Sequence, residues 1–251
     1  MDDMDGVAGL MCGWEEEIDE EIVQTICIGK EKSIKMEISL ALDDGQAPGS
    51  LFAYHVWNGA TCLSEFFASD PNIVKGKKTV EFGAASALPS LVALNLGATV
   101  AVMTDYPALV LIENMKKNVS RNAEKLCNGK AVVLGHLWGE DTAEIFKHSQ
   151  FESSSGFEIA IVAECLWLHK EHENLLSSIM TCLKSGGKAY ICFSHHVPGM
   201  ESQDLSFFDK ASRHYNCTVE KLKTFQVQAV FNSAKTKDQF LYCITKLSNN
   251  K

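Results

Sequence analysis

A turn followed by a carboxylate is the first feature of the chain that suggests ligand chemistry. The strand-like run 79–82 ends at Gly83, and Asp105 follows 22 residues after that glycine, at the end of a second such run. Gly83 lets the backbone approach a ligand closely, and a carboxylate in the Asp105 position can accept hydrogen bonds from ribose hydroxyls. The later glycines of G-x-G-x-x-G, which seat a pyrophosphate, are missing. The pair therefore indicates an adenosine ligand without a pyrophosphate; the alternative is a structural turn with a capping aspartate.

Two tryptophans accompany this predicted ligand site. Trp138 follows the third strand-like run, where an adenine ring would lie, so its ring could cover the adenine. Trp57 precedes the first helix that we expect in the core. Taken alone, each tryptophan is more often a packing residue than a ligand contact.

More polar residues follow the strand-like run 158–163. Glu164 stands at the end of this run and could orient an amine nucleophile, or could be a surface or capping residue. His169 and His172 are three residues apart, but no further ligand pattern accompanies them, so we expect no metal. His195 follows the next strand and could contact a substrate or belong to a plain loop.

The elements that must position these residues alternate between strand and helix. We predict strands at 79–82, 99–104, 131–134, 158–163, 188–193, 218–223 and 239–245, and helices at 89–96, 108–120, 172–183 and 204–215, with Gly186-Gly187 ending the third helical region. This alternation indicates an α/β fold, a mostly parallel Rossmann-like sheet of seven strands with helices on both faces.

The first fifty residues are predicted to form an arm and a hairpin ahead of a domain that spans 51–251. Residues 1–20 are acidic and irregular, which is typical of a mobile arm. The runs 22–28 and 34–40 predict a β-hairpin, and 43–50 a loop.

Composition narrows the class of protein further. The net charge of −9 over 251 residues disfavours a general nucleic-acid binder and fits a small molecule or a basic protein partner, although it also fits a protein with no partner. No run of eighteen apolar residues predicts a membrane span, and the N-terminus lacks the features of a signal peptide. The nine cysteines are scattered, which favours reduced thiols and a cytoplasmic location.

The stretch Val80–Val119 resembles the nucleotide-binding core of the family-16, seven-β-strand protein methyltransferases. Within them it is most similar to the nicotinamide-N-methyltransferase-like fungal enzymes that methylate the N-terminus and a nearby lysine of elongation factor 1-alpha. Gly83–Ser90 and Thr104–Pro107 carry this resemblance, which covers roughly residues 50 to 245. Further matches lie in order on either side of these stretches, at Trp57-Asn58, Trp138-Gly139, His169–His172 and Ser194–Pro198.

The resemblance implies S-adenosylmethionine as the cofactor. It implies a cofactor site lined by Trp57, Glu81, Gly83, Ala84, Ala85, Asp105, Trp138 and Ala163. The catalytic candidates are Glu164, which would hold an ammonium group, and His169, which would remove its proton unless bulk water does so. The family usually has Asp at position 164, Asn at 168 and Ser at 163, so these departures from its pattern concern the substrate end.

The activity implied is N-methylation of a protein amine, either a lysine or an N-terminal amine, with elongation factor 1-alpha as the expected partner. Two other readings stay open. One is methylation of a small molecule such as nicotinamide, or of an RNA base. The other is a module that binds the cofactor without activity.

Overall fold

The computed structural model describes residues 22–40, 55–148, 156–230 and 232–248. The predicted arm 1–20 and the predicted loop 43–50 lie outside these residues. Within the described part of the chain, no helix is long and apolar enough to cross a membrane.

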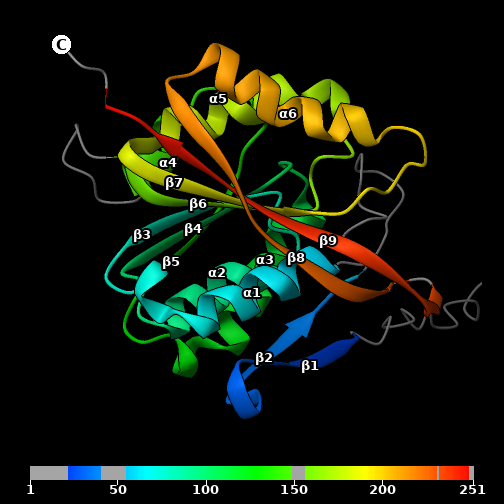
Figure 1. The fold of residues 1–251 in the computed structure, drawn as a ribbon. Helices are drawn as coiled ribbons and strands as arrows, with labels where there is room; N and C mark the ends of the chain where they lie inside the picture. Colours follow the sequence, from blue (N-terminus) through cyan, green and yellow to red (C-terminus); the bar gives the residue numbers. More distant parts are fainter. Residues whose placement is uncertain (1–21, 41–54, 149–155, 231, 249–251) are drawn as a thin grey trace, which may run out of the picture.

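A seven-stranded sheet runs through the centre of the molecule in the order β5-β4-β3-β6-β7-β9-β8 (Figure 1). Its strands are β3 (Lys78–Phe82), β4 (Val100–Asp105), β5 (Lys130–Gly135), β6 (Phe157–Ala163), β7 (Leu183–Phe193), β8 (Cys217–Ala229) and β9 (Asn232–Lys246). The first five are parallel to one another, and β9 is antiparallel to both β7 and β8. The predicted Rossmann-like α/β fold is confirmed.

Helices cover both faces of this sheet (Figure 1). One layer holds α1 (Asn58–Ser69), α2 (Leu88–Asn95) and α3 (Leu109–Arg121), and the other holds α4 (Ala143–His148), α5 (His172–Cys182) and α6 (Glu201–His214). Successive side chains of each strand point to opposite faces of the sheet, so the strands contribute to two separate cores. Along β4, Ala101 and Met103 face the first layer, whereas Val100 and Val102 face the second.

The predicted N-terminal hairpin is present as β1 (Val23–Ile28) and β2 (Ile34–Ser39). Two asparagines, one in α3 and one just after it, bind its backbone: Asn118 Nδ2 donates to the Ser39 carbonyl at 2.9 Å, and Asn122 Nδ2 donates to the Glu37 carbonyl at 2.7 Å. Ile28, Met36 and Ile38 are fully buried in the first core. The hairpin therefore shares a core with the helices of the sheet.

The C-terminal strands differ most from the prediction. The last pair between β7 and β9 is Phe193 with Phe240, so residues 232–239 run past the end of β7 and pair only with β8. This projecting part of β8 and β9 is called the β8–β9 arm below (residues 225–230 and 232–239). The glycine pair is a second difference, because α5 ends at Cys182 and Gly186-Gly187 lie inside β7 instead of ending a helix.

Candidate active site

The turn after β3 holds its shape through several left-handed residues. Gly83 has φ +69°, and Ala85 and Ala87 have φ +46° and +60°. The Ala84 N–H donates to the Thr104 carbonyl at 3.0 Å, which ties the turn to the neighbouring strand. A β carbon on Gly83 would lie 2.6 Å from the sulfur of Cys165 and 3.3 Å from the Trp138 ring. Glycine is needed here for both its conformation and its lack of a side chain.

Asp105 binds this turn directly. Its Oδ2 accepts the Ala85 N–H at 2.7 Å, and its Oδ1 accepts the Tyr106 N–H at 2.7 Å. Burial raises the pKa of the Asp105 carboxyl, and these two backbone donors oppose the shift. Each carboxylate oxygen keeps a further lone pair, so Asp105 has acceptor capacity left for two hydroxyl groups. The structure thus brings together the two residues that the sequence singled out for an adenosine ligand.

Glu81 lies beneath the same turn and is almost fully buried. Its Oε2 accepts the Ser90 N–H, in the first turn of α2, at 3.1 Å. Burial raises the pKa of Glu81 to about 8. This hydrogen bond to Ser90 fixes the start of α2, the helix that follows the turn.

Trp138 is half-buried and faces Gly83 from the loop after β5. The hydroxyl of Ser178 in α5 fixes this loop, because it lies 2.9 Å from His136 Nε2 and accepts the Gly139 N–H at 2.9 Å. Burial lowers the pKa of His136. The Trp138 indole is thereby held beside the turn at Gly83, where it could cover a planar ligand ring bound at the ends of the strands.

Glu164 is the most constrained polar residue at the end of β6. Its φ is +57°, and its own N–H donates to the Cys192 carbonyl at 2.8 Å. Its Oε1 accepts the Gly59 N–H at 3.1 Å, and its Oε2 accepts the Ser194 N–H at 3.1 Å and lies 2.8 Å from His196 Nε2. Two segments far from Glu164 in sequence, one at Gly59 and one at Ser194–His196, therefore converge on this one buried carboxylate.

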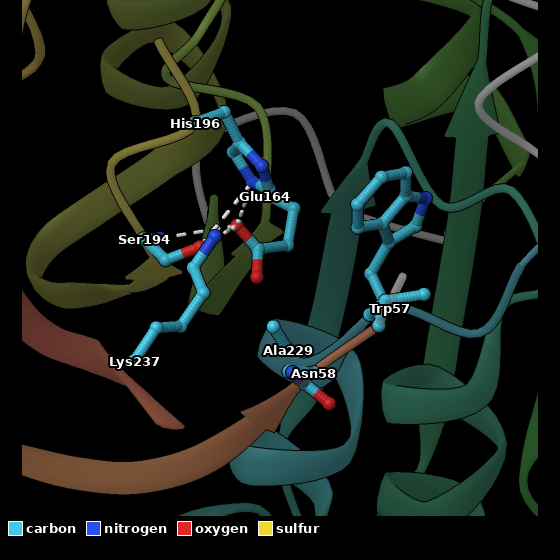
Figure 2. A pocket seen from close by; sticks show the side chains of 8 residues that line it. Trp57, Asn58, Glu164, Ser194, His196, Ala229 and Lys237 are labelled. Atoms are coloured by element: carbon cyan, nitrogen blue, oxygen red, sulfur yellow. Dashed lines mark hydrogen bonds and ion pairs between the residues drawn. The ribbon is translucent and has the colours of Figure 1, made fainter. Parts of the chain in front are cut away.

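Beside Glu164 lies a pocket of about 120 Å³. Figure 2 shows its lining, which consists of Trp57, Asn58, Glu164, Ser194, His196, Ala229, Val230 and Lys237. The Trp57 and His196 rings meet edge to face, with centroids 5.2 Å apart. Pockets for whole ligands are usually about 300 Å³ or more. This one has the size for the end of a side chain.

His169 belongs to a different cluster from Glu164. Its Nε2 lies 2.6 Å from Asp204 Oδ1, and His195 Nδ1 lies 2.7 Å from the other oxygen of the same buried carboxylate. His172 is buried, with Nε2 2.7 Å from the Leu166 carbonyl. Among the described residues, no group of three or more His, Cys, Asp and Glu side chains could hold a metal ion.

Sequence reasoning missed Gly59, Cys165 and Asp204 as partners of these residues, and Lys237 as a residue that lines the pocket. His196 entered the sequence analysis only within the stretch Ser194–Pro198. The signal available for it was its place just after β7, since the carboxyl ends of parallel strands share one edge of the sheet.

The fold and the strand-end site define a methyltransferase of the Rossmann-like class. Two solved structures show the fold: SMU.776 complexed with SAH (TM-score 0.56, 16% identity, 91% of this chain and 57% of that one), and Pyrococcus horikoshii TYW2 in complex with MeSAdo (TM-score 0.54, 13% identity, 91% and 73%). The chain belongs to the lysine methyltransferase family, which it matches over residues 35–214. It is a methyltransferase that depends on S-adenosylmethionine.

Similar proteins of fungi carry a more specific name. The chain is 31% identical to the protein N-terminal and lysine N-methyltransferase efm7 of Schizosaccharomyces pombe over 74% of this chain and 70% of that protein. The protein of the same name from Neurospora crassa is 38% identical, over 66% of this chain and 61% of that protein.

Proposed function

We propose that this protein transfers a methyl group from S-adenosylmethionine to a protein amine. The observation that carries the proposal is the buried Glu164 carboxylate, which lies at the end of β6 and lines a pocket sized for a side-chain end. Burying a carboxylate costs free energy unless it is hydrogen-bonded, and here the Gly59 and Ser194 N–H groups donate to it. An arriving ammonium group would find a fixed negative charge.

The residues of the cofactor site fit the adenosine part of S-adenosylmethionine. We propose that Asp105 receives the ribose hydroxyls and that Trp138 covers the adenine. Gly83, Ala84, Ala85 and Ala163 would offer backbone beside the rest of the molecule, with Trp57 closing the acceptor side and Glu81 holding the turn from below. When bound, the cofactor supplies a methyl group on a positively charged sulfur.

The chain's own residues have to orient the amine and let it lose a proton. The free pKa of a lysine is about 10.4, whereas an α-amino group lies near 8, so the lysine needs more help. Glu164 would hold the ammonium group, and the proton would leave to water once the amine is aligned. Alignment in a water-poor pocket is then the main source of rate, and it can contribute several kcal/mol.

The geometry favours Glu164 over His169 as the group that touches the amine. His169 Nε2 is engaged with Asp204, whereas Glu164 lines the pocket itself. We therefore propose that His169 shapes the rim of the site together with His195, through their shared contact with Asp204.

For the substrate we propose elongation factor 1-alpha, at its N-terminal amine or a lysine. The resemblance to the fungal enzymes and the names of the similar fungal proteins support this choice. The net charge of −9 favours encounter with a basic protein segment. We place the reaction in the cytoplasm, where the scattered cysteines would stay reduced.

The test is to incubate the protein with methyl-labelled S-adenosylmethionine and, in separate reactions, purified elongation factor 1-alpha, nicotinamide and bulk RNA. We expect label in the protein, and mass spectrometry of its peptides would locate the methylated nitrogen. Transfer to nicotinamide or RNA with none to protein would overturn the proposed substrate. Binding of the cofactor with no transfer to any acceptor would overturn the proposed activity.

A further inference from the structure

The β8–β9 arm brings a lysine of the chain into the pocket beside Glu164. The residues of β9 that precede Phe240 pair only with β8. Lys237 lies opposite Val227, and Thr236 lies opposite Gln228. The arm is anchored where it passes α1, because Asn58 Nδ2 donates to the Gln228 carbonyl at 2.7 Å. Ala229, Val230 and Lys237 of this arm line the pocket.

The period of the strand directs the Lys237 side chain inward. Gln239, two residues on, is fully buried, with its Nε2 3.7 Å from the Cys192 sulfur, and Leu241 is also fully buried. Residues two apart point to the same face of a strand, so Lys237 shares their inward face. Figure 2 shows the Lys237 side chain pointing toward Glu164, Ser194 and His196. Its terminal amine thus points into the pocket whose Glu164 carboxylate is expected to bind a substrate amine.

We propose that Lys237 is a self-methylation site of this protein. The proposal rests on the proposed function, since it requires the pocket to be the amine site. In the step, the ammonium of Lys237 loses a proton to water, and the nitrogen lone pair then forms a bond to the methyl carbon. The bond from that carbon to sulfur breaks, and its electron pair stays on sulfur, which leaves S-adenosylhomocysteine and N-methyllysine. Methylation keeps the charge of the lysine.

The transfer is intramolecular in this geometry, because the arm reaches the pocket of its own chain. The competing role for Lys237 is that of a positive counter-charge to Glu164 that is never methylated. A Lys237→Arg variant keeps the charge and removes the acceptor, so it separates the two roles. Lys235 offers a matched control: it lies on the same strand and the same face, two residues further out, and is exposed.

The experiment uses the full chain with methyl-labelled S-adenosylmethionine and no other acceptor. We expect peptide mapping to place the methyl label on Lys237. The total label incorporated should fall by at least nine-tenths in Lys237→Arg and should be unchanged in Lys235→Arg. The labelled fraction per unit time should not depend on protein concentration. If Lys237 is already methylated as purified, that modification should be missing from Asp105→Ala, which is expected to bind the cofactor poorly.

A mixing experiment tests the intramolecular geometry. Asp105→Ala, which keeps Lys237, is incubated with Lys237→Arg, which keeps the cofactor site, and label on Asp105→Ala would contradict transfer within one chain. Label on other residues, or none on Lys237 while elongation factor 1-alpha is methylated in a parallel reaction, would overturn the self-methylation and leave the proposed function standing. Label on Lys237 with none on any added protein would support self-methylation and overturn the proposed substrate.

Discussion

The sulfur of Cys165 fills the space in which a side chain at Gly83 would stand, 2.6 Å from the position of the missing β carbon. Cys165 follows Glu164, which we propose to hold the amine, and Gly83 opens the turn that we propose to bind the cofactor, so this contact joins the two halves of the proposed site. The Cys165 thiol donates to the Phe82 carbonyl at 3.6 Å, and burial raises its pKa well above the ordinary value, which keeps it neutral.

Gly83→Ala should lower both stability and cofactor affinity. A left-handed alanine costs about 1–2 kcal/mol, and the clash with Cys165 adds to it. Gly76→Ala is the matched control, because Gly76 has φ +73° and nothing within 4 Å of its would-be β carbon. Urea unfolding and calorimetry with S-adenosylmethionine should show the larger loss for Gly83→Ala. In a Cys165→Ala background the Gly83→Ala cost should fall toward that of Gly76→Ala; equal costs in both backgrounds would show that the contact is irrelevant.

Asp105→Ala should reduce affinity for S-adenosylmethionine at least tenfold, since each hydrogen bond to a charged group contributes about 1.5–3 kcal/mol. It should also lower stability without ligand, because Ala85 and Tyr106 lose their acceptor. Asp141→Ala is the control, since the exposed Asp141 also accepts a backbone N–H, that of Ala143 at 3.0 Å. The control should keep its affinity. A fall in stability alone for Asp105→Ala would assign that residue a structural role.

Glu81 should make the stability of the protein depend on pH. Its pKa rises from 4.5 to about 8 on folding because burial disfavours the charged form. The folded state therefore holds a proton that the unfolded state has released, and the free energy of unfolding should fall between pH 4.5 and about 8, by at most about 1.4 kcal/mol per pH unit. Glu81→Gln keeps an acceptor for Ser90 and has no proton to lose, so its curve should be flatter. Urea unfolding across this range measures both, and parallel curves would contradict the shift.

The proximity of Gly83 and Asp105 could be predicted from the sequence, because it depends on local patterns. A strand that ends in Gly83 and another that ends in Asp105 must deliver both residues to one edge of a parallel sheet. The lining of the acceptor pocket could not be predicted in the same way. Gly59, Ser194 and His196 meet Glu164 across 105, 30 and 32 residues of sequence, and no local pattern encodes such contacts.

The β8–β9 arm shows a second limit. Apolar and aromatic residues predicted strands at 218–223 and 239–245. The sheet buries Leu241, Cys243 and Ile244 of the second run, whereas the first run alternates between half-buried and exposed residues. The polar continuation that carries Gln226, Gln228 and Lys237 forms strand only because each half pairs with the other. Its length depends on the register of pairing, which the sequence pattern does not fix when neither face is buried. Lys237 was missed for this reason.

Gly59→Ala should impair the acceptor side while leaving the cofactor side intact. A β carbon there would lie 2.8 Å from Glu164 Cγ and 3.0 Å from the Cys192 carbonyl oxygen. Alanine is ordinarily better than glycine inside a helix by about 0.5–1 kcal/mol, so any harm comes from the displaced carboxylate. We expect a higher KM for the protein amine and an unchanged affinity for S-adenosylmethionine. Equal losses in both would mean that the whole edge of the sheet has moved.

Glu164→Gln tests the charge of the same carboxylate without changing its length. The glutamine oxygen can still accept one backbone N–H, from Gly59 or Ser194, but the side chain no longer attracts an ammonium group. Because a hydrogen bond to a charged group contributes about 1.5–3 kcal/mol, kcat/KM for the protein amine should fall roughly 10- to 100-fold. Affinity for S-adenosylmethionine should stay within about threefold, a difference of roughly 0.7 kcal/mol. Glu124→Gln removes an exposed carboxylate outside the site and should leave both values unchanged. If Glu164→Gln retains full activity toward the protein, the ammonium is held elsewhere and the assignment of this pocket as the amine site is wrong.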